Sequence, residues 1–170
     1  MSFPRTLAGL FSASALVVLA DRWTKVWVSR HIELGGAIPV LPSVLRITHW
    51  TNEGAAFSMF ADSASPHAVR WGLVAFSAIA ALIVAGLLVR MGRSLSCTSA
   101  GLALILGGAV GNLYDRVAYG SVVDFIEVHI LTYHWPDFNV ADSAIVTGAC
   151  LLMLEALLPQ KNADAAQSSE

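Results

Sequence analysis

The stretch WGLVAFSAIAALIVAGLLV, Trp71–Val89, runs for 19 residues without a charge and lies between Arg70 and Arg90. A helix needs about 20 mostly apolar residues to cross the hydrocarbon core of a bilayer. The segment therefore predicts a transmembrane helix, and it indicates that the chain is a membrane protein.

The composition agrees with a membrane protein. Of the 170 residues, 56% are hydrophobic and 13% are charged, whereas a soluble domain carries about 25% charged residues. We therefore expect membrane lipid to be the solvent for much of the chain. The net charge of −2 lacks the basic bias of nucleic-acid-binding proteins, so no nucleic acid partner is expected.

Three further segments have the length of a span. Leu95–Tyr114 is free of charges, and Val140–Leu158 is followed by Pro159. A third apolar run begins at Thr6. We predict an α-helical membrane protein with four transmembrane helices, at about residues 6–28, 68–90, 95–115 and 140–158. They form one membrane domain, residues 1–159, followed by a polar tail, residues 160–170.

The first run also fits a cleaved signal peptide, with Arg5 as its charged start and small residues as the cleavage site. However, the small residues Ser12–Ala15 fall in the middle of the apolar run. The charged end, with Trp23 and Trp27, is more typical of a helix that reaches the membrane interface. Cys97 and Cys150 lie far apart in apolar stretches and are predicted to be buried thiols rather than a disulfide.

Four spans place both termini on one side of the membrane. Arg5 precedes the first span, and two arginines lie in the short link at residues 90–95. Because positive charge marks cytoplasmic segments, we expect the termini and this link in the cytoplasm.

The two longer connecting segments, on the outer side, contain strand-like runs at Leu45–Thr51 and Ser121–Ile130. Alternate residues of a strand share a face. Asp124 would then lie on an otherwise apolar face, shared with Val122, Ile126, Val128 and Ile130. The sequence predicts two small strand regions on the outer membrane surface.

Acidic residues gather near the outer ends of the predicted spans: Asp21, Asp115, Asp124 and Asp142. Ionisable groups inside a bilayer are costly and are functional candidates by default. Each could instead be a solvated end residue or a helix cap, and Asp142 fits the cap best because it opens the fourth span.

Polar neighbours favour a shared pocket over isolated caps. Asn112, Asp115 and Arg116 have helical i, i+3 and i+4 spacing and so share one face. Asn139 lies three residues before Asp142. Asn52 precedes Gly54, and the segment 54–60 is predicted to be a surface flap or substrate wall.

Two carboxylates in one site do not both ionise easily, so one acts as base while the other keeps its proton. The base can activate water, and the acid can polarise an amide carbonyl. Such a pair needs no cofactor and no metal.

Other chemistries remain possible from spacing alone. The five histidines, His31, His49, His67, His129 and His134, could suggest zinc, but none forms H-E-x-x-H or a helical i, i+4 pair. We expect them to cap strands or face water. A Ser–Lys dyad of Ser29 and Lys25 is a second option, although Asp21 at i−4 explains Lys25 more simply as an ion pair.

Two classes without hydrolytic chemistry also stay open. A small transporter or channel subunit would use Asp21, Asp115 and Asp142 as a proton or cation path, with charges spread through the bilayer depth. A structural membrane subunit would merely pair its polar residues between helices.

Five sequence blocks carry a family resemblance. They are DRWTK (Asp21–Lys25), NEGAAFS (Asn52–Ser58), GGAVGNLYDR (Gly107–Arg116), GSVVDF (Gly120–Phe125) and FNVAD (Phe138–Asp142). In this order on a four-span chain they resemble the motif blocks of the bacterial lipoprotein signal peptidases, also called signal peptidase II. Tyr114 departs from the pattern, because an aliphatic residue is commoner there.

The resemblance implies an aspartyl endopeptidase of the bacterial inner membrane, with its active site near the outer face and a small β-cradle on that surface. Its substrates would be lipidated prolipoproteins, cut just before a diacylglyceryl-modified cysteine, and cyclic peptides of the globomycin type would inhibit it. We expect a monomer. By motif position, Asp124 and Asp142 would be the catalytic pair. The implied substrate-binding or supporting residues are Asn52, Gly54, Asn112, Arg116, Asn139, Ala141, Asp21 and Lys25.

Overall fold

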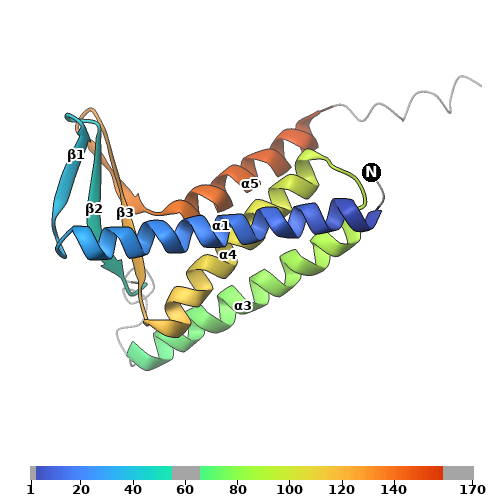
Figure 1. The fold of residues 1–170 in the computed structure, drawn as a ribbon, viewed down its shortest axis with the longest axis horizontal. Helices are drawn as coiled ribbons and strands as arrows, with labels where there is room; N and C mark the ends of the chain where they lie inside the picture. The colour runs from blue at the N-terminus through green and yellow to red at the C-terminus, as the bar shows by residue number, and fades with distance from the viewer. Residues whose placement is uncertain (1–2, 55–65, 159–170) are drawn as a thin grey trace, which may run out of the picture.

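The computed structural model describes residues 3–54 and 66–158 and arranges them as a helical bundle with a sheet at one end (Figure 1). The helices are α1 (Phe3–His31), α3 (Pro66–Met91), α4 (Cys97–Ala118) and α5 (Val140–Leu157). All four are long and apolar enough to cross a membrane. The predicted four-helix membrane fold is thus confirmed, while the tail, residues 160–170, lies outside the described residues.

The sheet has four antiparallel strands in the order β1-β2-β3-β4. These are β1 (Ala37–Leu41), β2 (Leu45–Asn52), β3 (Val122–Ile130) and β4 (Tyr133–Phe138). The two central strands match the predicted strand regions. The edge strands were not predicted, because Pro39 and Pro136 interrupt their patterns; proline is tolerated at sheet edges, where an N–H need not pair.

Helix α4 is the centre of the bundle. Half of the residues in its membrane span are buried, against 17–22% in the other three helices. Glycines allow α4 and α5 to approach closely: a Cβ added to Gly148 would lie 2.5 Å from the carbonyl oxygen of Gly101. This approach brings the first turn of α5, with Asp142, to the half of α4 that carries Asn112.

Apolar side chains cover the outside of the bundle, as expected for a lipid-facing surface. Phe76 and Leu82 of α3 are 70% and 73% exposed. Both cysteines are free thiols, as predicted. Neither is buried as predicted: Cys97 is half-buried, and Cys150 is exposed because it shares the outward face of α5 with Val146 and Met153.

The predicted faces of β3 are only partly correct. Asp124 is 5% exposed and Val122 is 3% exposed, so this end of the apolar face is buried as expected. The other face is covered too, because Phe125 packs with Val28 of α1 and with Ile32, which follows that helix. Towards the far end of β3, Ile130 is exposed rather than buried.

Candidate active site

The first turn of α5 fixes the position of Asp142. Asn139 is the N-cap of this helix, and its side-chain oxygen accepts from the Asp142 N–H at 3.0 Å. Asp142 Oδ2 in turn accepts from the Asn139 N–H at 3.2 Å. This is a capping box, which satisfies two N–H groups at the helix start. The helix cap that the sequence predicted at Asp142 is therefore present.

The cap accounts for only one oxygen of Asp142. The other, Oδ1, accepts from Asn112 Nδ2 of α4 at 2.8 Å. Asn112 is 6% exposed and also accepts from Lys25 Nζ at 3.0 Å. Asp142 is thus tied to the polar interior of the bundle as well as to its own helix.

Asp124 reaches the same network from the sheet. Its Oδ1 accepts from Asn139 Nδ2 at 2.7 Å, and its Oδ2 accepts from Asn52 Nδ2 at 3.1 Å. Asn139 therefore bonds both carboxylates and joins β3 to α5. The pKa of Asp124 is raised to about 6, chiefly by burial and in part by the charge of Asp142, while the bonds from Asn52 and Asn139 oppose the rise.

An open pocket of about 570 Å³ lies beside Asp124. Its wall includes Asn52, Gly54, Arg116 and Asp137. Asp142 is not among the described residues that line it, and its connection to the pocket runs through Asn139 and Asp124.

Gly54 shapes the rim of this pocket. It has φ +88°, where a Cβ is unfavourable, and a Cβ there would also collide with the Leu73 side chain. Its N–H donates to Asn52 Oδ1 at 2.8 Å, which orients the amide that bonds Asp124. Residues 55–60 of the predicted flap lie outside the described residues.

A buried ion network supports the site from behind. Lys25 Nζ lies 2.7 Å from Asp21 Oδ2 and 2.7 Å from Asp115 Oδ2. Asp21 Oδ1 accepts from the Ala141 N–H at 3.0 Å, another free donor at the start of α5. Asp21 and Lys25, predicted as supporting residues, therefore join α1 to α4 and to the first turn of α5.

The predicted shared face of α4 divides between two environments. Asn112 and Asp115 point into the buried network, whereas Arg116 lines the pocket and donates to Ser77 Oγ at 3.4 Å.

Two residues near the site were not predicted from the sequence. Arg22 lies 2.6 Å from Asp115 Oδ1, and its place inside the first motif block was the available signal. Asp137 lines the pocket two residues before Asn139.

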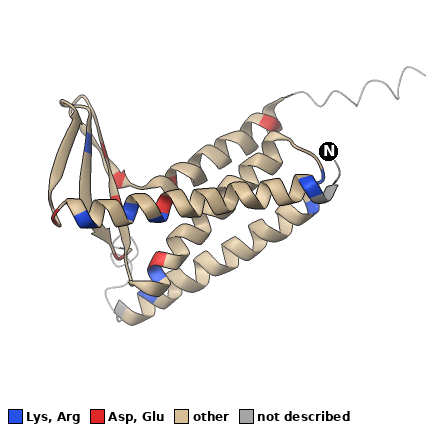
Figure 2. Ribbon diagram, viewed as in Figure 1, with Lys and Arg blue, Asp and Glu red and all other residues tan. Residues whose placement is uncertain are grey.

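The geometry also bears on the alternative chemistries. Lys25 is held as an ammonium ion by two carboxylates, which is unfavourable for the neutral base of a Ser–Lys dyad. Most acidic positions lie towards the sheet end of the bundle rather than through its depth (Figure 2). This arrangement argues against a path of charges across the membrane.

The sequence also matches a known protein family. Residues 13–158 match the family model described as Signal peptidase (SPase) II. The chain belongs to the signal peptidase II family. It is accordingly a membrane aspartic peptidase.

Close relatives support this membership. The chain is 44% identical over 153 residues to a lipoprotein signal peptidase of Paraburkholderia phytofirmans, covering 89% of this chain and 86% of the relative. It is 43% identical over 150 residues to one of Geobacter metallireducens, covering 87% and 90%.

Two solved bacterial membrane enzymes share the fold of this signal peptidase II family member. One superposes with a TM-score of 0.76 at 27% identity over 88% of each chain. The other has a TM-score of 0.73 at 30% identity and covers 90% of this chain and 95% of its own. The helices and the sheet thus form one known architecture.

Proposed function

We propose that this chain removes the signal peptide from prolipoproteins by cleaving the amide bond before a diacylglyceryl-modified cysteine, with Asp124 and Asp142 as the catalytic pair. The observation that carries the proposal is the position of Asn139, whose hydrogen bonds join both aspartates in one buried network. The relatives named lipoprotein signal peptidase supply the substrate class.

Asp142 is suited to be the ionised base. Its two oxygens accept hydrogen bonds from Asn112 and the Asn139 N–H, and it lies at a helix N-terminus, where negative charge is stabilised. It would take a proton from a water molecule whose oxygen attacks the scissile carbonyl carbon.

Asp124 is suited to be the acid. Its pKa is raised to about 6, chiefly by burial, which favours the protonated form that can donate to the carbonyl oxygen as the tetrahedral intermediate forms. When the C–N bond breaks, the proton held by Asp142 passes to the leaving nitrogen, and Asp124 recovers its own proton as the carbonyl is restored. Water and amide are thereby converted to acid and amine with no cofactor.

The remaining site residues have positioning roles in this scheme. Asn52 and Asn139 orient the Asp124 carboxyl group. Arg116, on the pocket wall, is placed to hold a backbone carbonyl of the substrate. A cyclic peptide of the globomycin class would compete for the same pocket.

The proposed orientation puts the sheet end of the bundle on the outer face of the bacterial inner membrane and both termini in the cytoplasm. Helix α1 begins and α3 ends at the end of the bundle opposite the sheet (Figure 1), and Arg5 and Arg90 lie in those terminal turns. Figure 2 shows basic positions beside the N-terminus. Positive charge of this kind marks the cytoplasmic side. The active site then lies where a lipidated substrate arriving through the bilayer meets water.

Isosteric substitution tests the dyad. Asp124→Asn and Asp142→Asn should each lower cleavage of a lipidated prolipoprotein by at least about 100-fold, because each removes one proton-transfer group. Purified protein in detergent is assayed for product by gel shift. Glu33→Gln, at an exposed position after α1, is the matched control and should cleave normally. Near-full activity of either folded aspartate variant would refute the dyad.

A further inference from the structure

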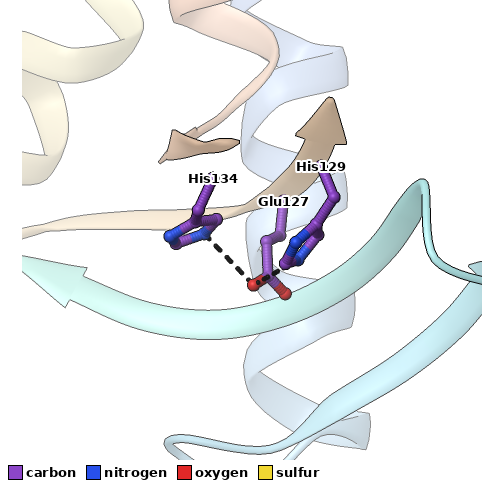
Figure 3. A group of neighbouring side chains, drawn as sticks. All are labelled: Glu127, His129 and His134. Carbon is purple, nitrogen blue, oxygen red and sulfur yellow. Dashed lines mark hydrogen bonds and ion pairs between the residues drawn. The ribbon is translucent and has the colours of Figure 1, made fainter. Parts of the chain in front are cut away.

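The sheet carries a second group of chemically reactive side chains away from the dyad, formed by Glu127 and His129 of β3 and His134 of β4 (Figure 3). His129 and His134 are directly paired across the hairpin. Glu127 lies two residues before His129, and alternate strand residues share a face. The sheet therefore brings three ligand-type side chains together, with their ligand atoms all within 4.8 Å of one another.

The donor atoms converge on one point. Nε2 of His129 lies 2.9 Å from Glu127 Oε1, and Nε2 of His134 lies 3.1 Å from the same oxygen. Around a tetrahedral zinc ion with bonds of about 2.0–2.1 Å, neighbouring donors stand about 3.4 Å apart. The two distances to Glu127 Oε1 would lengthen by only a few tenths of an ångström to reach this spacing, and the two imidazole nitrogens lie within 4.8 Å of each other.

The tautomer of each imidazole decides whether these atoms hold a proton or a metal ion. As Nε2–H tautomers, both rings can donate to Glu127 Oε1, and that arrangement needs no metal. With the proton on Nδ1, each ring offers its Nε2 lone pair instead, and a divalent cation can then bind both nitrogens and the carboxylate oxygen. The stacked rings, with centroids 5.1 Å apart, bring both Nε2 atoms to the same oxygen.

The surroundings resemble those of metal sites in proteins. Arg46 donates to both oxygens of Glu127, from Nε to Oε2 at 2.6 Å and from Nη2 to Oε1 at 2.5 Å. Outer hydrogen bonds of this kind commonly orient a ligating carboxylate. Asp137 Oδ1 lies 3.5 Å from His134 Nε2 and is buried without a hydrogen-bond donor. Apart from that long contact with His134 it has no partner among the described residues, so it is a candidate fourth metal ligand.

The group is also accessible. The Glu127 side chain is 6% exposed, but those of His129 and His134 are 29% and 52% exposed. A cation can therefore enter from solvent without opening the fold, as a metal site requires.

We propose that Glu127, His129 and His134 form a binding site for a zinc-class divalent cation that fastens the β3–β4 hairpin. The ligand set of two imidazoles and one carboxylate suits zinc and its neighbours rather than calcium or magnesium, which prefer oxygen. Because Asp137 contacts His134 and also lines the pocket beside Asp124, the bound ion would hold one wall of that pocket. The site does not depend on the proposed dyad.

Metal binding by the full chain tests this site. Metal-free protein in detergent is titrated with Zn²⁺ by calorimetry and with Co²⁺ by visible absorption. The wild type should bind one equivalent, and its Co²⁺ form should show the intense bands of tetrahedral nitrogen and oxygen coordination. His129→Gln and His134→Gln should each weaken Zn²⁺ binding at least tenfold and abolish those bands. His31→Gln, which changes an exposed histidine at the end of α1, should do neither.

His134→Gln is the decisive variant if His129→Gln fails to fold, because His134 lies on an edge strand and is half exposed. Equal Zn²⁺ affinity in wild type and His134→Gln would overturn the site. A wild type that binds no stoichiometric Zn²⁺ would also overturn it.

Discussion

Two groups of charged side chains, one between the helices and one on the sheet, use similar ion pairs in different surroundings. Asp21, Lys25 and Asp115 are at most 1% exposed, and one ammonium group bridges two carboxylates. On the sheet, Arg46 pairs with Glu127 while its side chain remains 43% exposed. Arg46 also holds the pKa of Glu127 below its usual range.

The two groups differ in whether water can replace an ion-pair partner that is lost. Water can solvate Arg46 if its pair is broken, and Glu127, although only 6% exposed, keeps its contacts with His129 and His134. Water has no access to the helical network, and a carboxylate left there without its cation keeps the full desolvation cost. We therefore expect the helical network to determine whether the fold is stable and the sheet group to tolerate change.

Lys25→Met should have the largest effect on stability. It removes the cation that Asp21 and Asp115 share, and breaking a buried pair on one side costs about 3–5 kcal/mol. Thermal unfolding in detergent should show a large decrease in Tm. The double variant Lys25→Met/Asp21→Asn is the control: Asp115 keeps Arg22, so part of the stability should return. If Lys25→Met alone had the Tm of the wild type, the helical network would be no more important for stability than the sheet group.

Gly111→Ala should have the next largest effect, because it tests how tightly the helical network is enclosed. The added Cβ would lie 3.0 Å from Asp21 Oδ2, and that carboxylate is held in place by Lys25 and the Ala141 N–H. Overpacking of this kind costs about 1–3 kcal/mol. Tm is again the measurement.

Gly72→Ala is the matched control on α3, where an added Cβ would meet no atom within 4 Å. Alanine is favoured over glycine in a helix interior, so this variant should be at least as stable as the wild type. If both alanine variants behaved alike, the close packing around Asp21 would have no energetic consequence.

Arg46→Met tests the sheet group and should lower Tm less than Lys25→Met does. Glu127 would keep its contact with His129 at 2.9 Å, and solvent could reach the space left by the half-exposed arginine. The comparison is made in the same detergent and buffer. A decrease in Tm equal to that of Lys25→Met would show that exposure does not separate the two groups.

The four helices were predictable because runs such as Trp71–Val89 contain no charge, and a bilayer excludes unpaired polar groups. The pairing of Asp124 with Asn139 was not predictable from spacing, because periodicity shows which face a residue occupies but not what lies opposite. Motif order suggested these residues as site members, whereas the hydrogen bond that joins them depends on how β3 lies against the start of α5.

The group around Glu127 was missed for a different reason. The histidines were compared with helical metal motifs, whereas His129 and His134 meet across a hairpin. A strand pattern of Glu-x-His followed by a two-residue turn, Leu131 and Thr132, was the available signal. His134, whose side chain is 52% exposed, faces water as predicted, whereas His129 is 29% exposed and contacts Glu127.

The smallest expected effect is a shift in the pH dependence of cleavage. It reports on Asp124, which lies where the sheet meets the helical network. If Asp124 must be protonated, kcat/KM for a prolipoprotein should decrease as pH rises through about 6, the pKa to which burial raises this residue. Asn52 donates to Asp124 Oδ2 and so favours the ionised form. Asn52→Ala removes that donor, which raises the pKa of Asp124 further and moves the decrease to higher pH.

Thr51→Val is the matched control, because Thr51 precedes Asn52 on β2 but pairs with Val123 rather than with Asp124. Its pH profile should coincide with that of the wild type. A shift to lower pH in Asn52→Ala would mean that the amide stabilises the protonated carboxyl instead. If the wild-type limb near pH 6 rose with pH, Asp124 would be the base rather than the acid, and the roles within the dyad would be reversed while the dyad itself remained.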